Sequence, residues 1–357
     1  MNTNALQFFN LYCPMYQNIL VVRTDKIGDV VLTTAALHAL RQKFPAAKIS
    51  VLISSQTRDL VAGNPDVDAV LVDDRAGVHK GMGYLRLVRE IRRRHFDLAV
   101  IYHTKKRTNF LCWAAGIPVR MGYKDKKFGF LLNAPVPDDR PLGRKHEVYY
   151  CLEVLKTLGV TDSPVTLHVP IHPDNEAWVK NWMGRCRISP AQNLIAVSPS
   201  ASCPTRRWPV TRFIELIQGL QGRFKASFVI VGGQEGIPLA EEIQRAVSGP
   251  VYNLAGKTTL GQLVSLLKRC NLLVSNDSGP VHVAAALGTP VVSIFTRNQP
   301  GINPERWKPL GEKSVYVAPD EDLSISFARG VVADSAFLYT VTPQEVLRAV
   351  DALFKLC

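Results

Sequence analysis

Short apolar runs alternate with longer segments of helical spacing along most of the chain. In the first half the runs at 19–22, 48–53 and 97–102 have the length of buried strands, and helical spacing at 30–44 and 84–94 separates them. A strand, a helix and a second strand form the repeating unit of a parallel sheet. The first half is therefore expected to form a parallel α/β domain.

The same pattern restarts after a proline-rich passage, Ser163–Asp174. Four more strands are expected, at 194–197, 228–231, 272–275 and 291–295. A chain of 357 residues is long enough for two domains of ordinary size. We therefore expect two α/β domains, 1–170 and 171–357. The sequence leaves open which of them the last helical segment, 343–356, packs on.

Composition favours a globular protein of a reducing compartment. Hydrophobic residues make up 46% of the chain and charged residues 20%, which argues against disorder. The seven cysteines are scattered without a CxxC pair, so neither a disulfide framework nor a thiolate zinc site is expected. No apolar stretch reaches the roughly 18 residues that span a bilayer, and Met1–Asn18 lacks the features of a signal peptide. We expect a cytoplasmic protein.

Positive charge is concentrated in one segment. The formal net charge is +13, and residues 80–150 hold 16 Lys or Arg against 6 Asp or Glu. Such an excess fits a solvated basic face, nucleic acid, an anionic membrane surface or an anionic substrate. Aromatic residues are not interleaved with the charges as a base-stacking surface requires, which disfavours a nucleic-acid partner.

Two turns from a strand into a helix carry polar residues. In Asp277–His282 (DSGPVH), Ser278 and Gly279 let the backbone turn, and Pro280 suits a first helical turn. The free N–H groups and dipole of such a helix end attract anions, so a phosphate site is expected. Arg23–Asp29 (RTDKIGD) is the second such turn. Because ligands bind beyond the carboxyl ends of parallel strands, we expect one cleft between the two domains.

Two further loops have the chemistry of nucleotide binding. Ser200–Trp208 (SASCPTRRW) places small hydroxyl residues beside two arginines, a combination that suits a diphosphate. In Gly232–Glu235 (GGQE) a tight turn precedes a carboxylate that can accept both hydroxyls of a ribose. The alternatives are a generic connection for the first loop and a dipole-stabilised acidic residue for the second.

Several other classes of site are excluded because their motifs are incomplete or absent. Ala255–Thr258 (AGKT) lacks the opening glycine of a P-loop, because position 251 is valine. Gly81–Arg86 (GMGYLR) has arginine in place of the third glycine of a dinucleotide fingerprint, and no GxSxG motif of a serine hydrolase occurs. His168 and His172 flank a proline in an extended segment, so no metal site is expected there.

Three motifs in order carry a family resemblance: ILVVRTDKIGDVVLTTAAL near the start, RRWP in the middle and LLVSNDSGPVHVAAALGTPVVSIF near the end. From about Ile19 to Lys308 the chain resembles the ADP-heptose:lipopolysaccharide heptosyltransferases, glycosyltransferase family 9. The resemblance implies a GT-B fold, two Rossmann-like domains whose parallel sheets face each other across a cleft. It also implies bacterial lipopolysaccharide biosynthesis, by inverting, metal-independent transfer of heptose from ADP-heptose to an inner-core acceptor. The ADP-sugar is a substrate, so no cofactor is expected.

The resemblance also assigns residues. Asp29 takes the place of the general base, Arg206 that of the residue holding the diphosphate, and Glu235 that of the ribose ligand. The other candidates for donor binding are Ser200, Ser202, Asp277, Ser278, Gly279 and His282. A helix N-terminus is expected to keep Asp29 ionised at neutral pH and to make it a weaker base. The alternative for Asp29 is a helix N-cap without a catalytic role.

The resemblance also gives the basic segment a specific interpretation, because it implies an anionic lipid A–core acceptor bound by the first domain. Candidates for contact with it, or with the anionic cytoplasmic leaflet, are Lys105, Lys106, Arg107, Lys126, Lys127 and Arg144. Peripheral contact with the inner membrane is therefore an open expectation, and no nucleic-acid partner is expected. A glycosyltransferase of this fold with another nucleotide sugar, and a non-catalytic protein binding anions or nucleic acid, remain alternatives.

Overall fold

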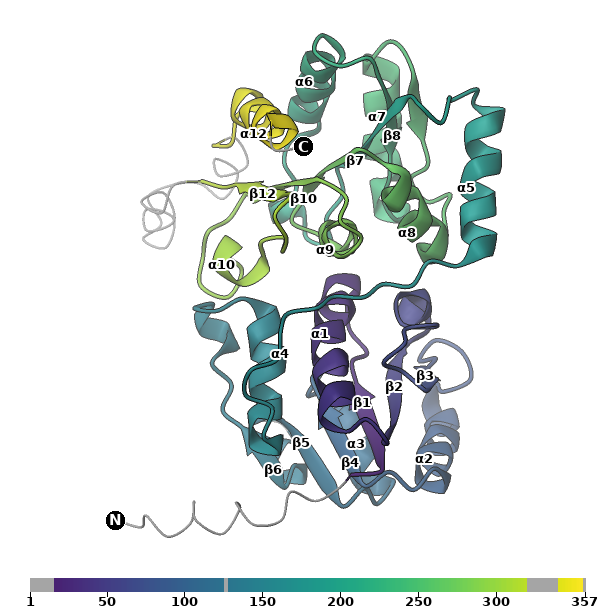
Figure 1. Cartoon of the computed structure of the whole chain (residues 1–357), viewed down its shortest axis with the longest axis vertical. Coiled ribbons are helices and arrows are strands. Elements are labelled where there is room, and N and C mark those ends of the chain that lie inside the picture. Colours follow the sequence, from purple (N-terminus) through teal and green to yellow (C-terminus); the bar gives the residue numbers. More distant parts are fainter. Residues whose placement is uncertain (1–15, 125–127, 320–339, 356–357) are drawn as a thin grey trace. The chain divides into compact units, whose positions relative to one another are not determined.

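The computed structural model describes residues 16–124, 128–319 and 340–355 (Figure 1). The chain forms two compact units. Residues up to Asp139 together with Glu147–Leu167 make the N-terminal unit, and Arg140–His146 together with the residues from His168 onwards make the C-terminal unit. A short segment, 140–146, thus belongs to the C-terminal unit although the chain on both sides of it belongs to the N-terminal unit.

The N-terminal unit contains a six-stranded parallel sheet in the order β3-β2-β1-β4-β5-β6. Its strands are β1 Asn18–Val22, β2 Lys48–Ser54, β3 Ala69–Asp73, β4 Leu98–Ile101, β5 Val119–Tyr123 and β6 Ala134–Val136. In the central strand, Ile19 to Val22 have no exposed surface, because helices cover both faces of a parallel sheet. The predicted parallel sheet is confirmed.

Four helices accompany this sheet: α1 Ile27–Lys43, α2 Tyr84–Arg93, α3 Lys106–Ala114 and α4 Glu147–Leu155. Helix α1 packs against α4, and α2 packs against α3. Leu87 of α2 and Leu111 of α3 share a buried cluster with Leu20 and Val22 of β1, so these two helices cover one face of the sheet. Short 3₁₀ segments lie at Ser55–Leu60 (η2), Gly81–Gly83 (η3), Gly129–Leu131 (η4) and Lys156–Leu158 (η6).

The C-terminal unit repeats the design with a sheet in the order β12-β11-β10-β7-β8-β9, again all parallel. Its strands are β7 Asn193–Ser198, β8 Ala226–Ile230, β9 Val251–Asn253, β10 Leu272–Asn276, β11 Val291–Ile294 and β12 Ser314–Val317. Its helices are α5 Pro173–Arg185, α6 Val210–Gln221, α7 Ile237–Ala246, α8 Leu260–Arg269, α9 Gly279–Ala286, α10 Pro304–Trp307 and α12 Pro343–Lys355. Its 3₁₀ segments are η5 Arg140–Leu142, η7 Pro204–Arg206 and η8 Gln234–Gly236.

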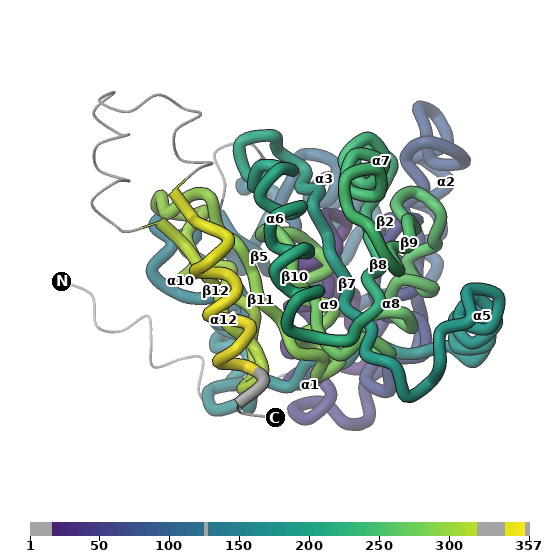
Figure 2. The backbone as a smooth tube through the Cα atoms, turned by 90° about the horizontal axis from the view of Figure 1, so that it is seen from above, coloured from purple at the N-terminus to yellow at the C-terminus, as the bar shows by residue number. Residues whose placement is uncertain are grey.

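Helix α12 packs on the C-terminal unit, beside β12 and α6 (Figures 1 and 2). Val346 and Val350 belong to the core of that unit. Leu347 lies over Gly219 of α6, where an added Cβ would come 2.9 Å from the leucine Cδ1. Thr342 and Glu345 form a capping box at its start, with the threonine N–H donating to the glutamate carboxylate at 2.7 Å. The partner that the sequence left open is therefore the C-terminal sheet.

Each sheet has a position at which the strand order reverses. In the N-terminal unit the chain builds β2 on one side of β1 and then β4 on the other. In the C-terminal unit β8 and β10 flank β7 in the same way. Ligands of open α/β sheets bind beyond the carboxyl ends of the strands at such switch points. Ligands are therefore expected at the loops after β1 and β4 and at those after β7 and β10. No helix of the described residues is long and apolar enough to cross a membrane.

Candidate active site

Arg23, directly after β1, is the centre of a buried ionic cluster. Its side chain is 2% exposed. The guanidinium Nη2 donates a hydrogen bond to Asp29 Oδ1 and a second one to Glu147 Oε1 at 3.1 Å. The Nε atom lies 2.9 Å from Asp25 Oδ1 as an ion pair. One arginine therefore joins the first turn of α1 to the first turn of α4.

Asp29 is the third residue of α1, and the N-cap position belongs to Lys26, which makes no side-chain cap. The carboxylate of Asp29 bonds to Arg23, and its backbone carbonyl accepts a hydrogen bond of 2.8 Å from Thr33 Oγ1. The alternative of Asp29 as an N-cap is wrong. Its side chain is 15% exposed, which leaves part of the carboxylate open to solvent.

The pKa of Asp29 departs from its ordinary range in the direction opposite to the prediction. Burial raises the pKa, Arg23 opposes that rise, and the negative charges of Asp25 and Glu147 add to it. Burial outweighs the lowering of the pKa that was expected from the helix N-terminus. The sequence alone does not show how deeply this turn is buried. Asp29 is thus a stronger base than an exposed carboxylate, as general-base chemistry favours.

A second polar cluster lies at the ends of β1, β3 and β4. The Asp73 side chain, 1% exposed, accepts two hydrogen bonds from Arg107, at 2.8 Å and 2.6 Å, and one from Arg75 at 2.9 Å. Arg75 also donates to Thr24 Oγ1 at 2.7 Å, and that hydroxyl lies 2.9 Å from His103 Nδ1. The cluster holds two guanidinium groups, 41% and 26% exposed, at the carboxyl edge of the sheet.

These contacts fix the charge states of the cluster. Burial acts to raise the pKa of Asp73, but hydrogen bonds from Arg107 and Arg75 outweigh it, and the pKa is lowered. Burial, together with the positive charges of nearby Arg23 and Arg75, lowers the pKa of His103 to about 4. His103 is therefore neutral at neutral pH, and its ring can donate or accept a hydrogen bond without adding charge.

The acceptor candidates divide between the two units. Lys105 and Lys106 are exposed at the start of α3, and Arg107 is held by Asp73. Arg144 is exposed in the segment 140–146 of the C-terminal unit. The candidates Lys126 and Lys127 lie outside the described residues.

In the C-terminal unit, Asn276 ties two loops together at the end of β10. It has no exposed surface. Its Nδ2 donates to the Pro199 carbonyl at 2.7 Å, and its Oδ1 accepts the Trp208 backbone N–H at 2.9 Å. The loop after β7 and the arginine-bearing loop are thereby fixed to the turn after β10. Sequence analysis did not single out this residue, although a polar side chain at the end of an apolar strand is a signal of such a role.

The predicted change from strand to helix after β10 is confirmed. Ser278 is the N-cap of α9, Gly279 is its first residue and Pro280 follows in the first turn. Ser278 makes no side-chain cap; its Oγ lies 3.1 Å from Ser275 Oγ. Pro280 has no N–H, and the Val281 N–H donates to the Ser278 carbonyl at 3.1 Å. The N–H groups of Ser278 and Gly279 are therefore the ones at this helix start that can receive an anion.

Arg206 and Asp277 meet beside this turn. Arg206 Nη1 donates to Asp277 Oδ2 at 3.4 Å, and the arginine is 28% exposed. Together with four residues of the loop after β11 they line a narrow hollow; those residues are Phe295, Thr296, Arg297 and Ile302. The guanidinium is thus oriented beside the N-terminus of α9, where the sequence predicts a diphosphate.

The two other donor loops lie against each other. Ser200 is 5% exposed, and a Cβ at Gly232 would come 2.8 Å from its Oγ, so a larger residue at 232 would displace the hydroxyl. Glu235 is exposed in η8, with its carboxylate over Gly233. Ser202 is exposed in the loop after β7. Ser200 therefore meets the GGQE turn through its hydroxyl.

His282 lies inside α9 and is buried, with 3% of its surface exposed. Burial, with a smaller contribution from nearby His146, lowers its pKa to about 3. Its ring packs on Trp307 at a centroid distance of 6.3 Å, and its Nδ1 has no hydrogen-bond partner. The histidine is neutral at neutral pH and supplies no cationic charge to a phosphate.

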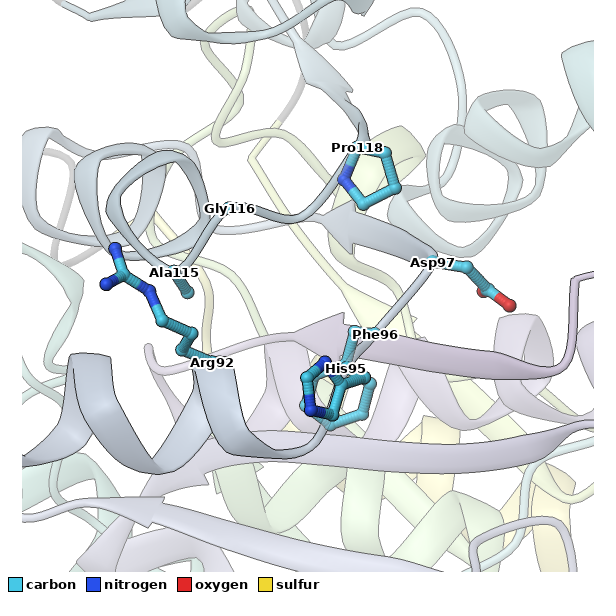
Figure 3. A pocket seen from close by; sticks show the side chains of 7 residues that line it. All are labelled: Arg92, His95, Phe96, Asp97, Ala115, Gly116 and Pro118. Carbon is cyan, nitrogen blue, oxygen red and sulfur yellow. The ribbon is translucent and has the colours of Figure 1, made fainter.

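A wider hollow of about 520 Å³ lies at the opposite edge of the N-terminal sheet (Figure 3). Asp97 and Pro118, which immediately precede β4 and β5, contribute to its wall. It is formed at the amino ends of these strands, whereas the ionic clusters follow their carboxyl ends. Its lining therefore contributes nothing to the chemistry described above. Within the described part of the chain, no three His, Cys, Asp or Glu side chains are grouped to hold a metal ion.

The chain matches a known protein family. Residues 84–335, more than half of the chain, match the family described as glycosyltransferase family 9 (heptosyltransferase). The chain is 27% identical over 349 residues to lipopolysaccharide heptosyltransferase 2 of Escherichia coli K12, covering 94% of this chain and 98% of that protein.

Solved structures agree with this. The crystal structure of a family 9 glycosyltransferase from Veillonella parvula has a TM-score of 0.84 at 26% identity, covering 96% of this chain and 99% of that one. The structure of E. coli ADP-heptose LPS heptosyltransferase II has a TM-score of 0.77 at 23% identity, covering 94% and 98%. The predicted GT-B class, with two Rossmann-like units, is confirmed. The chain belongs to glycosyltransferase family 9, the heptosyltransferases, and is a glycosyltransferase.

Proposed function

We propose that this enzyme transfers heptose from ADP-heptose to an inner-core sugar of a lipid A-linked acceptor, with inversion at the anomeric carbon and without a metal ion. The observation that carries the proposal is the buried carboxylate of Asp29, bonded to Arg23 and raised in pKa. Two comparisons support the choice of substrates. A relative along nearly the whole chain is a lipopolysaccharide heptosyltransferase, and one structural neighbour is an ADP-heptose LPS heptosyltransferase.

In the proposed reaction the acceptor hydroxyl gives its proton to Asp29. The oxygen forms a bond to the anomeric carbon from the face opposite the diphosphate. The bond between that carbon and the diphosphate oxygen breaks at the same time, and its electron pair leaves with ADP. Arg23 stays charged throughout and keeps the carboxylate oriented. The proton on Asp29 is then released to solvent.

The C-terminal unit is proposed to hold the donor and stabilise the leaving group. The backbone N–H groups at the start of α9 and the Arg206 guanidinium supply the positive charge that a departing diphosphate requires. These groups support metal independence, because they take over the charge neutralisation that a divalent cation otherwise gives. Glu235 is proposed to accept the ribose hydroxyls, since its carboxylate is exposed next to the glycine turn.

The acceptor side of the proposal rests on the N-terminal unit. Arg75 and Arg107 present partly exposed guanidinium groups at the carboxyl edge that also carries Asp29. Carboxylates and phosphates of an inner-core acceptor match such groups in charge and geometry. We further propose that the enzyme works at the cytoplasmic leaflet as a peripheral protein and has no nucleic-acid partner.

A panel of nucleotide sugars tests the donor. A ligand that binds only the folded protein raises its melting temperature, so ADP-heptose should raise it more than GDP-, UDP- or CMP-sugars. Transfer to a purified acceptor, with the product linkage read by NMR and the assay repeated in chelator, then tests inversion and metal independence. A shift confined to another nucleotide would replace ADP-heptose in the proposal. Binding of ADP-heptose without turnover on any inner-core acceptor would favour a non-catalytic role.

A further inference from the structure

Exposed hydrophobic side chains gather on one part of the N-terminal unit. Among the described residues ten large hydrophobic side chains are exposed, and six of them come from the segments around η3, α2, α3 and η4. We call these six the α2–α3 face: Val78, Met82, Leu85, Phe110, Trp113 and Phe130. Met82 is 80% exposed, Phe130 79% and Trp113 48%. Soluble proteins rarely leave such a group uncovered without an interaction partner.

Ring contacts join the members of this face. Phe110 and Trp113 lie one turn apart on α3, and their centroids are 5.6 Å apart. Phe110 stacks on Tyr84 of α2 at 6.3 Å. Because Lys106, Phe110 and Trp113 recur at helical spacing, they form one stripe along α3.

The stripe continues onto η4. Lys106 Nζ lies 5.6 Å from the centre of the Phe128 ring, and that ring lies 5.6 Å from the ring of Phe130. On the other side, Leu85 is exposed in the first turn of α2, directly after Tyr84. The exposed rings and aliphatic side chains therefore belong to one surface and are not scattered singly.

The segments that carry this face are strongly basic. Residues 78–116 include nine Lys or Arg and only two acids, Glu90 and Asp97. Glu90 pairs with Arg94 at 3.2 Å, and the Asp97 carboxylate accepts two backbone hydrogen bonds. The exposed cations of the segment are Lys80, Arg86, Arg89, Arg92, Arg93, Arg94, Lys105 and Lys106.

The combination of exposed hydrophobic and basic side chains indicates which partner binds the α2–α3 face. Exposed Trp, Phe, Leu and Met beside a group of Lys and Arg is the composition of protein surfaces that lie in the headgroup region of anionic bilayers. A second copy of the chain would place like charges opposite one another. Nucleic acid offers no partner for the aliphatic members Val78, Met82 and Leu85.

We propose that the α2–α3 face docks the protein on an anionic lipid surface. Its six hydrophobic side chains enter the headgroup layer, while the lysines and arginines around them contact lipid phosphates. The inference rests on the proposed function in one respect, since a lipid-anchored acceptor gives the docking its purpose. Arg107 connects the two regions, because its guanidinium lies 4.2 Å from the Tyr84 ring centre and also bonds to Asp73 at the carboxyl edge.

Vesicle co-sedimentation tests the proposal with the full-length protein and no nucleotide sugar present. The probes are vesicles of phosphatidylglycerol and phosphatidylethanolamine in equal parts, and vesicles of phosphatidylcholine. The native protein should sediment with the anionic vesicles, and high salt should release part of it. Replacing Arg86 and Arg89 together by Gln should weaken binding at least about tenfold, since each charge near an anionic surface contributes several-fold in affinity. Replacing Phe110 and Trp113 together by Ser should abolish the part of the binding that survives high salt.

Matched variants separate docking from general charge and folding effects. Lys180→Gln with Arg185→Gln removes two exposed charges from α5, and Tyr149→Ser removes a side chain of α4 that is 49% exposed. Both should bind vesicles as the native protein does. Melting temperatures identify any variant that fails to fold, and Trp113→Phe then serves as the milder change, with a smaller loss expected.

Three results would overturn the proposal. One is no sedimentation of the native protein with anionic vesicles, and another is an equal loss in the α5 control. The third is a change of oligomeric state in the Phe110 and Trp113 variant with vesicle binding intact, which would make the face a protein interface. Asp29→Asn should sediment normally. Failure of docking and failure of sugar transfer are therefore distinguishable.

Discussion

Glu147 Oε1 accepts a hydrogen bond of 3.1 Å from Arg23 Nη2, although 124 residues separate the two in the chain. Glu147 is 1% exposed and begins α4. Because the same guanidinium nitrogen bonds to Asp29, the glutamate fixes the position from which Arg23 holds the proposed base.

Glu147→Gln should therefore lower kcat by about tenfold while leaving ADP affinity unchanged. The negative charge of Glu147 raises the pKa of Asp29, so its removal lowers that pKa and makes the carboxylate a weaker base. The acid limb of the pH–rate profile should move to lower pH. A limb that stays in place, or moves to higher pH, would show that Glu147 does not act through Asp29.

Asp29→Asn should reduce transfer by about 10²–10⁴-fold, the usual contribution of a general base. ADP should still bind, since the donor candidates belong to the C-terminal unit. Titration calorimetry with ADP and a turnover assay measure the two properties. Asp25→Asn is the matched control, because Asp25 also contacts Arg23 and is 20% exposed, but it is not placed as the base. Equal losses in the two variants would point to Arg23 and not to Asp29.

Asn276→Ala should lower the free energy of unfolding by about 3 kcal/mol and weaken ADP binding as well. The change leaves the Trp208 N–H and the Pro199 carbonyl without their partner in a fully buried position. Denaturant unfolding and ADP titration are the measurements. Asn271→Ala, just before β10, removes a hydrogen bond of 2.9 Å from the Leu194 N–H and should destabilise the fold without changing ADP affinity. Equal effects on affinity would contradict a role for Asn276 at the donor loops.

His282 should make the protein acid-sensitive. Burial lowers its pKa to about 3, whereas the unfolded chain binds a proton near the ordinary value of about 6.5. The unfolded state therefore gains protons first, and stability is lost as the pH falls from about 6.5 towards 3, on the order of 5 kcal/mol. In His282→Leu the melting temperature should depend less on pH over that interval. His95→Asn, a change at an exposed histidine, should keep the native dependence. An unaltered slope in His282→Leu would refute the assignment.

Local patterns in the sequence were sufficient for the central strands of the two parallel sheets. The runs at Ile19 to Val22 and Leu272 to Ser275 are continuously apolar because both faces of their strands are covered. The turn at Asp277 was also readable, since glycine and proline restrict the backbone there. Strands β3, β5, β6, β9 and β12 were missed. Strands β3 and β12 are only half-buried in places, β5 contains an arginine and a glycine, and β6 and β9 are three residues long, with a proline in β6.

The electrostatics of the site could not be predicted from local sequence. The pKa of Asp29 depends on burial and on Glu147, which reaches Arg23 only because α1 packs against α4. The pKa of Asp73 is lowered by hydrogen bonds from Arg107, which lies 34 residues further along the chain. These pairings follow from the strand order β3-β2-β1-β4, which propensity does not specify. Of these residues, Asp29 and Arg107 were named beforehand, and the family resemblance supplied the roles expected of them.

The segment 140–146 has a practical consequence for protein engineering. The segment is held in the C-terminal unit by hydrogen bonds from Asn303 to the Gly143 carbonyl at 3.1 Å and from Arg306 to the Arg140 carbonyl at 2.9 Å. Because the chain leaves the N-terminal unit, returns at Glu147 and leaves again after Leu167, no single cut separates the two units. A chimera that joins halves of two family members at 167/168 would carry this loop from the wrong parent. Exchange of specificity between relatives therefore requires two splice regions, with 140–146 taken from the parent protein that supplies the C-terminal half.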